Sequence, residues 1–176
     1  ELTEGAHAAR LAALYCCTPD ETPAQAARYA AVLDGLETTF GAHTEAGLYS
    51  APGRTEIGGN HTDHQHGCVL AAAVDMTTTA EVTLNGTKRI RVNSEGYKPV
   101  EIDLSDLAVK GSEKNTTAAL IRGVAAAFAQ RGYKLAGFDA KVSSTVLPGS
   151  GLSSSAAFEV LIGRILNLSL IHISEP

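Results

Sequence analysis

The chain has 176 residues, of which 44% are hydrophobic and 19% charged, as in a globular domain with one sizeable core rather than a disordered segment. Its formal net charge of −5 argues against nucleic acid or an anionic membrane surface as a partner. We see no signal peptide and no apolar run of the ~20 residues that a membrane span needs. Two of the three cysteines are adjacent, which is unsuited to a disulfide framework, so we expect a cytoplasmic protein. We also expect a monomer.

The N-terminal part of the chain is predicted to be helical, and strands follow. Alanine and leucine at helical spacing predict helices over residues 1–18 and 22–42. Apolar or alternating runs then predict strands over residues 48–53, 68–74, 77–85, 89–94 and 98–104, followed by a helix over 117–131, a strand over 138–146 and a helix over 153–168. The strand 48–53 is predicted to end at the Pro52-Gly53 turn. The alanine-rich run 68–74 is interpreted as a core strand, with Cys68 buried at its edge. Helices and strands mix without regular alternation, which favours an α+β fold in one domain.

The stretch "GGNHTDHQHG", residues 58–67, holds half of the six histidines. His61, Asp63, His64 and His66 are residue types that bind zinc. Their order does not match the His-x-His-x-Asp-His zinc pattern, and no second ligand cluster is visible. A zinc site and a loop of solvated histidines both remain open from these residues alone.

The stretch "TVLPGSGLSSSAAFEVLIG", residues 145–163, is typical of a phosphate-binding turn. Glycines let the backbone approach a ligand closely, and a helix N-terminus offers free N–H groups and a positive dipole end to an anion. A hydroxyl could also bind Mg²⁺ carried by a nucleotide. The stretch is neither a Walker A loop nor a dinucleotide fingerprint, because no lysine follows the glycines and Ser154 occupies the third glycine position. A turn before a serine-capped helix is also a common structural feature, so this stretch does not decide the function alone.

Together the two stretches resemble a known family. "APGRTEIGGNHTDHQHGCVLAAAVD", residues 51–75, resembles the galactokinase signature, and "LPGSGLSSSAA", residues 147–157, resembles the phosphate loop of the GHMP small-molecule kinases, the superfamily that includes galactokinase. The resemblance extends over about residues 6–168. It implies the α+β fold of the GHMP kinase N-terminal domain (ribosomal protein S5 domain 2-like), with a mixed sheet packed with helices. It also implies galactose and ATP as substrates and Mg²⁺ as cofactor.

The resemblance implies roles for individual residues. Arg54 matches the catalytic arginine near the transferred phosphoryl group, where a fixed positive charge stabilises the transition state. Asp63 matches the aspartate that accepts hydrogen bonds from sugar hydroxyls, and His61 belongs to the same substrate-binding motif. Asn60 stands where many galactokinases have a sugar-binding glutamate, a departure that bears on sugar selectivity. The phosphate loop is matched by Gly149, Ser150, Gly151, Leu152, Ser153, Ser154 and Ser155, with Ser154 as the expected Mg²⁺ ligand. On this resemblance, residues 60–66 are interpreted as a sugar-recognition loop rather than a zinc site.

The resemblance also implies parts that lie beyond this chain. In the family an aspartate base follows the phosphate loop by some tens of residues, and a second domain comes after it. We therefore expect residues 1–168 to be an incomplete GHMP kinase N-terminal domain without its C-terminal domain, and residues 169–176 to be a non-native tail. We expect this truncation to leave the apolar residues of the last helix unburied. The resemblance implies a galactokinase that makes galactose 1-phosphate; the alternative is a non-catalytic, galactokinase-like sensor of sugar and nucleotide that regulates a partner protein.

Overall fold

The computed structural model describes residues 5–59, 62 and 65–173. The helices within this part are α1 (Ala8–Tyr15), α2 (Pro23–Phe40), α3 (Thr117–Gln130) and α4 (Ser154–Ile173), with short 3₁₀ turns η1 (Pro19–Glu21) and η3 (Gly111–Glu113). The strands are β1 (Gly47–Gly58), β2 (Leu70–Leu84), β3 (Arg89–Ser94), β4 (Val100–Asp103) and β5 (Phe138–Ser144). The predicted order of helices and strands is correct except that the predicted strands 68–74 and 77–85 form one strand, β2. The last helix continues to Ile173, beyond the predicted end at residue 168.

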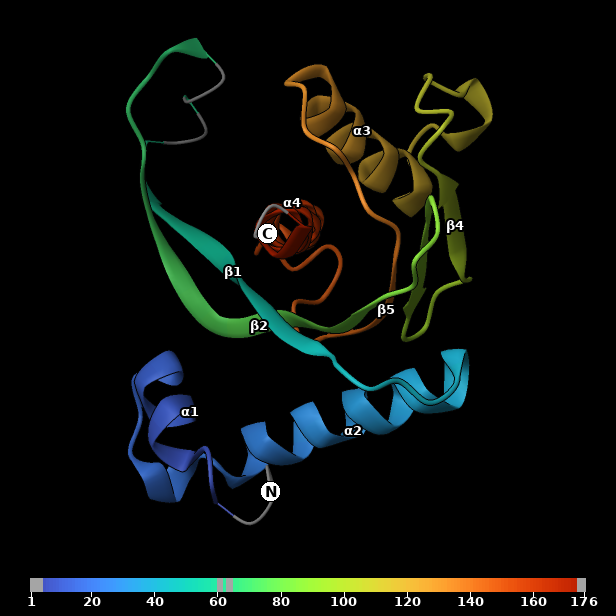
Figure 1. Cartoon of the computed structure of the whole chain (residues 1–176). Coiled ribbons are helices and arrows are strands. Elements are labelled where there is room, and N and C mark those ends of the chain that lie inside the picture. The colour runs from blue at the N-terminus through green and yellow to red at the C-terminus, as the bar shows by residue number, and fades with distance from the viewer. Residues whose placement is uncertain (1–4, 60–61, 63–64, 174–176) are drawn as a thin grey trace.

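The five strands form one mixed sheet in the order β1-β2-β5-β3-β4. β5 pairs in parallel with β3, and the other neighbouring pairs are antiparallel. The sheet is strongly curved: α4 lies inside its concave side together with α3, while α1 and α2 lie on the opposite side (Figure 1). The predicted α+β class, with a mixed sheet packed with helices, is confirmed.

The main core lies between the sheet and the two C-terminal helices. Phe138, Ile90 and Ile102 from the strands have no exposed surface, and they belong to one cluster with residues of α3 and α4. Four side chains of α4 are fully buried in it: Leu161, Ile162, Ile165 and Leu166. The prediction that the last helix would leave its apolar residues unburied is therefore wrong over this part of α4, because the curved sheet surrounds the helix (Figure 1).

The first two strands are longer than the sequence predicted. β1 continues through Pro52-Gly53 to Gly58, and β2 is one strand rather than two. Pairing of β2 with β5 begins at Thr78, so the first half of β2 pairs with β1 as a two-stranded ribbon. Most of the alanine-rich run 68–74 lies on this ribbon and is largely exposed, and so is Cys68. Their interpretation as core residues is wrong because the ribbon extends past the strand that would complete the sheet beside it.

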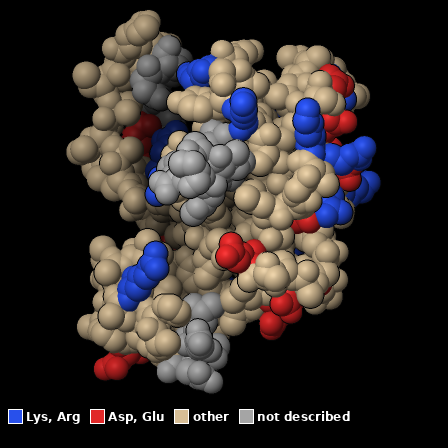
Figure 2. Space-filling model, in the orientation of Figure 1, with Lys and Arg blue, Asp and Glu red and all other residues tan. Residues whose placement is uncertain are grey.

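Charged and apolar side chains are distributed unevenly over the surface. Lysine, arginine and acidic side chains gather together over the β3–β4 side of the molecule, on the right in Figure 2. Two exposed ion pairs lie in this region, Arg89 with Glu101 and Lys110 with Asp106. Exposed apolar side chains occur both there, at Val109, and on the β1–β2 ribbon, where Ile57 is 65% exposed and Leu70 is 63% exposed. In the part of the chain that the structure describes, no helix has the length and apolar character needed to cross a membrane.

Candidate nucleotide and sugar site

The predicted phosphate loop connects the end of β5 to the start of α4. Gly149 and Gly151 have positive φ angles of 76° and 79°, a conformation that glycine adopts at little cost. Ser153 also has a positive φ, 60°, which is unfavourable for a residue with a Cβ and is often found at functional sites. α4 begins at Ser154, within one residue of the predicted start, and the Ala157 N–H donates its first bond to the carbonyl oxygen of Ser153 at 3.0 Å. The preceding amides of the first turn have no intrahelical acceptor and can bind an anion.

Hydroxyl groups fix the base of this loop. The Ser144 and Thr78 hydroxyl oxygens lie 2.8 Å apart, joining β5 to β2. The Ser144 hydroxyl also accepts a bond from the Val146 N–H at 3.1 Å, which starts the turn away from the strand. Within the loop, the Ser150 hydroxyl and amide both donate to the carbonyl oxygen of Leu147, at 2.6 and 3.3 Å. The donors of Ser150 are thus used to shape the loop.

Arg54 lies directly against the phosphate loop. Its backbone N–H, on β1, donates to the carbonyl oxygen of Leu152 at 3.1 Å. The neighbouring Gly53 is buried, and a Cβ built on it would lie 3.1 Å from the same carbonyl oxygen and 3.2 Å from Val146 Cγ1. A larger residue would therefore need the loop or Val146 to shift by a few tenths of an ångström. The structure brings together the two sequence motifs, although they are far apart along the chain.

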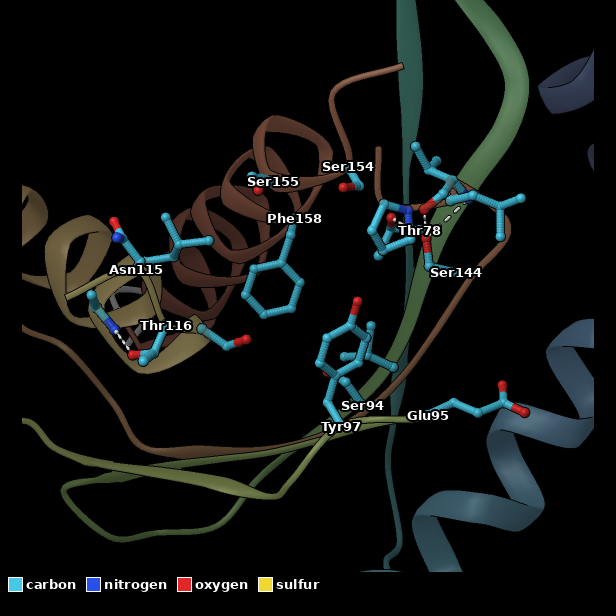
Figure 3. Close-up of a pocket in the computed structure, with 17 residues that line it drawn as sticks. Thr78, Ser94, Glu95, Tyr97, Asn115, Thr116, Ser144, Ser154, Ser155 and Phe158 are labelled. Carbon is cyan, nitrogen blue, oxygen red and sulfur yellow. Dashed lines mark hydrogen bonds between the residues drawn. The ribbon is translucent and has the colours of Figure 1, made fainter. Parts of the chain in front are cut away.

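The phosphate loop opens onto a cavity of about 710 Å³. Figure 3 shows the Phe158 ring projecting from α4 into this space, toward Tyr97 from the turn after β3, with Asn115 and Thr116 at the start of α3 on the other side. Glu95 is the one charged residue among the described residues that line the cavity. The other lining residues are Thr78, Ser94, Thr117, Ala119, Leu120, Val142, Ser144, Val146, Leu147, Pro148, Ser154 and Ser155. The cavity is therefore mostly apolar and uncharged, with hydroxyl groups at the end next to α4.

The sequence did not point to the cavity residues outside the phosphate loop. Tyr97 and Asn115 lie in turns without a recognised motif, and the topology of the sheet brings them together. Thr116 carried a weak signal, because a threonine before an apolar helix predicts an N-cap. It does cap α3: its side-chain oxygen accepts a bond from the Ala119 N–H at 3.4 Å and donates one to the Glu113 carbonyl at 2.6 Å.

The predicted sugar-binding residues Asn60, His61 and Asp63 lie outside the described residues, as does His64. The described neighbours form a tight turn around Thr62, whose hydroxyl donates to the Gly59 carbonyl at 2.8 Å and whose carbonyl accepts from the Gly67 N–H at 2.8 Å. Among the described residues no group of three or more histidine, cysteine or acidic side chains is placed to hold a metal ion. Because His61, Asp63 and His64 are not described, the zinc alternative for this stretch stays untested.

Two family models match the chain in the order of its two motifs. Residues 36–84 match the galactokinase galactose-binding signature, and residues 119–175 match the GHMP kinases N terminal domain. The chain is 39% identical over 130 residues to a galactokinase of Streptomyces coelicolor, covering 73% of this chain and 33% of that protein. The chain belongs to the galactokinase family of the GHMP kinases. The resemblance stated from the sequence motifs is thereby confirmed.

Other relatives and solved structures agree with this family. A galactokinase of Lactococcus lactis is 29% identical over 150 residues, covering 83% of this chain and 37% of that protein. The crystal structure of Lactococcus lactis galactokinase complexed with galactose superposes with a TM-score of 0.75 at 28% identity, over 84% of this chain and 38% of that one. Methanococcus jannaschii mevalonate kinase shares the fold, with a TM-score of 0.58 at 17% identity over 77% of this chain and 43% of that one. The chain thus spans about a third of the length of the galactokinases it matches.

Proposed function

We propose that this chain is the N-terminal part of a galactokinase that transfers the γ-phosphoryl group of ATP to the 1-hydroxyl of galactose. The observation that carries the proposal is the hydrogen bond between Arg54 and Leu152, which places the arginine of the galactokinase motif beside the loop of the kinase motif. A cavity large enough for a nucleoside opens on the same loop. The proposal includes that the chain is an incomplete GHMP kinase N-terminal domain, since it spans about a third of the length of its relatives.

The cavity suits the nucleoside part of ATP, and the loop suits its phosphates. The apolar walls around Phe158 would contact the uncharged base. The phosphates would lie over Gly149, Gly151 and the first turn of α4, where free amides and the helix dipole favour negative charge. The Ser154 hydroxyl lines the cavity at this end, and as a hard oxygen ligand it fits a Mg²⁺ ion carried by ATP. Bound there, that ion would neutralise phosphate charge.

The remaining roles concern the acceptor. The Arg54 guanidinium would stabilise negative charge on the phosphoryl oxygens during transfer, since its backbone is fixed at the loop. Asp63 would accept hydrogen bonds from sugar hydroxyls, with Asn60 and His61 in the same loop contributing to substrate binding. The acceptor proton would pass to an aspartate from the rest of the longer protein, as the resemblance implies. Phosphoryl transfer depends mainly on this positioning and on charge stabilisation.

The test is an assay of the longer gene product with ATP, Mg²⁺ and four acceptors: galactose, N-acetylgalactosamine, mevalonate and homoserine. We expect galactose to turn over fastest and the product to carry phosphate on the 1-hydroxyl, as ³¹P NMR would identify. Faster turnover of mevalonate or homoserine would contradict the proposal. Binding of galactose and ATP without turnover would support the alternative, a galactokinase-like sensor. The 176-residue chain alone should show no turnover.

A further inference from the structure

Arg28 reaches from α2 across to the middle of β2. Its Nη1 donates to the Thr77 hydroxyl at 2.8 Å, and its Nη2 donates to the Thr77 carbonyl oxygen at 2.6 Å. Thr77 is only 6% exposed, so these charge-assisted bonds form in a largely desolvated place. Two bonds from one guanidinium fix both the position and the orientation of this residue of β2.

Thr77 lies at the point where the two halves of the candidate site meet. On one side it pairs with Pro52 of β1, two residues before Arg54. On the other side its N–H donates to the Thr145 hydroxyl at 3.0 Å, and its carbonyl accepts from the Thr145 N–H at 3.0 Å. Thr145 is two residues before Leu147, where the phosphate loop begins. Thr77 therefore contacts residues that lie just before Arg54 on β1 and just before the phosphate loop at the end of β5.

Together with the hydrogen bond from Arg54 to Leu152, these contacts form a closed ring of neighbouring residues. From Thr77 the chain of contacts runs through Pro52 to Arg54, from Arg54 to Leu152, and back along the loop to Thr145 and Thr77. β1 has a register shift between Pro52 and Arg54, so the pairing of Arg54 with Ala73 is not in register with the pairing of Pro52 with Thr77. Arg28 joins this ring to α2: it bonds to Thr77 and also donates to the Thr79 hydroxyl at 3.5 Å.

We propose that Arg28 is a positioning residue for phosphoryl transfer, which sets the relative placement of Arg54 and the phosphate loop through Thr77. The proposal rests on the proposed function. Without the guanidinium, the Thr77 carbonyl keeps its bond from Thr145, but Thr77 loses its hydrogen bonds to α2. The position of Arg54 relative to the phosphate loop is then less fixed. The sugar motif, residues 60–66, follows the outer end of β1, and the outermost pair of the ribbon, Gly58 with Leu70, is remote from Thr77. We therefore expect sugar binding to depend less on the bonds of Arg28.

The first test uses steady-state kinetics of the longer protein with Arg28→Met, Arg28→Lys and Arg28→Ala. Because small misplacements of reacting groups are costly, we expect Arg28→Met to lower kcat by about 10- to 100-fold. The KM for galactose should change by less than about threefold, since the sugar loop is remote from Thr77. Arg28→Lys should recover part of kcat, and added methylguanidinium should raise kcat of Arg28→Ala. The matched control is Arg89→Met on β3, which removes an arginine bound to Glu101 away from Thr77.

Three results would overturn the proposal. The first is a kcat for Arg28→Met within about twofold of that for Arg89→Met, which would mean that the arginine has no special position. The second is an equal loss of kcat and of the folded fraction, which would indicate a general structural role. The third is the absence of any recovery with both lysine and methylguanidinium.

A second test does not need activity, and it separates this inference from the proposed function. Hydrogen exchange is measured on wild type and Arg28→Met. The amides of Thr145 and Arg54 should exchange about tenfold faster in the variant, while the amides of Ile90 and Ile102 should be unchanged. Unchanged exchange at Thr145 and Arg54 would overturn the inference. Suppose that the wild type phosphorylates none of the acceptors, while Arg28→Met still shows faster exchange at Thr145 and Arg54. This result would refute the proposed function but would support the role of Arg28 in fixing the geometry.

Discussion

The N–H of Arg54 donates a hydrogen bond to the carbonyl oxygen of Leu152, and this bond joins strand β1 to the loop before α4. A backbone bond at this place fixes the Cα of Arg54 relative to the loop, whatever rotamer its exposed side chain adopts. The phosphate loop and Arg54 are thus joined directly through the backbone.

Arg54→Lys tests the charge chemistry of this unit. Lysine keeps the positive charge but loses the planar fork that matches phosphoryl oxygens. We expect kcat of the longer protein to fall by ~10²- to 10³-fold, as for loss of a transition-state donor, with a smaller change in the KM for ATP. Arg131→Lys, at the exposed end of α3, is the control. A kcat within about threefold of wild type would be incompatible with the role of Arg54.

Gly53→Ala tests the close approach of β1 to the loop. The new methyl group would lie 3.1 Å from the Leu152 carbonyl oxygen and 3.2 Å from Val146 Cγ1, so one of them must move. We expect a loss of about 1–3 kcal/mol in the free energy of unfolding, measured with urea, because the site is overpacked. Gly123→Ala on α3 is the control: its Cβ would meet nothing within 4 Å, and it should stabilise the helix by roughly 0.5–1 kcal/mol. Equal effects of the two substitutions would show that the contact at Gly53 is not restrictive.

Glu81→Gln tests a buried carboxyl group on β2. Burial raises the pKa of Glu81, Asp34 and Glu37 of α2 raise it further, and His43, whose Nε2 lies 3.5 Å from Oε1, only partly offsets this. Neither carboxylate oxygen has a hydrogen-bond partner among the described residues. The folded state therefore holds a proton more tightly than the unfolded state, and this contribution to stability is lost as pH rises through the raised pKa of Glu81.

The glutamine variant lacks this titration. We expect its free energy of unfolding to increase relative to wild type as pH rises through the same window, measured by urea unfolding at several pH values. Glu159→Gln, at an exposed position on α4, is the control. A pH-independent difference for Glu81→Gln would mean that the carboxyl group is solvated in solution.

Arg122→Met tests the hydrogen bonds that join α3 to the segment before it. Arg122 is 5% exposed, and its guanidinium donates to both Glu113 oxygens at 2.7 Å and to the Asp106 carbonyl. Hydrogen bonds from Arg122 lower the pKa of Glu113, so this stabilisation is lost as pH falls through that lowered pKa. We expect Tm to fall by at least about 4 °C near pH 7, because acceptors lose their partner. Lys110→Met breaks only an exposed ion pair and should change Tm by about 1 °C or less. A similar, small change in both variants would contradict this account.

Asp63→Ala tests the interpretation of the histidine-rich stretch. The loss of a charged acceptor worth about 1.5–3 kcal/mol should raise the KM for galactose by about 10- to 100-fold, with little effect on the KM for ATP. Elemental analysis of the purified protein gives the second measurement. We expect no stoichiometric zinc; one tightly held zinc per chain, with activity lost in a chelator that spares Mg²⁺, would instead favour the metal site.

The features that the sequence predicted correctly are those with local causes. Glycines and serines mark the turn before α4, and the apolar spacing marks the helix, so both could be placed to within a residue at that end. Pro52 and Gly53 misled the prediction of β1, because a proline can remain in a strand where the pairing shifts, and that depends on the partner strand. The exposure of the alanine-rich part of β2 depends on where β5 ends, and the burial of α4 depends on sheet curvature. The cavity residues come from four separate segments, which only the topology unites.

The two-stranded ribbon has a consequence for how such a kinase can change during evolution. Residues 70–73 of β2 pair with β1, residues 74–76 lie at the register shift, and none of them pairs with β5; at ~3.3 Å per residue this segment extends about 20 Å beyond the shared sheet. Residues 59–69, which carry the sugar motif, join the outer ends of these strands, whereas the phosphate loop is anchored to the core. Substitutions at exposed positions such as Gln65 and Cys68 therefore cost little folding free energy, whereas Gly59 and Gly67 are constrained because a Cβ there would lie within 2.6 Å of other atoms. Under the proposed function, acceptor selectivity can diverge in this architecture without reconstruction of the phosphate loop and the cavity beside it.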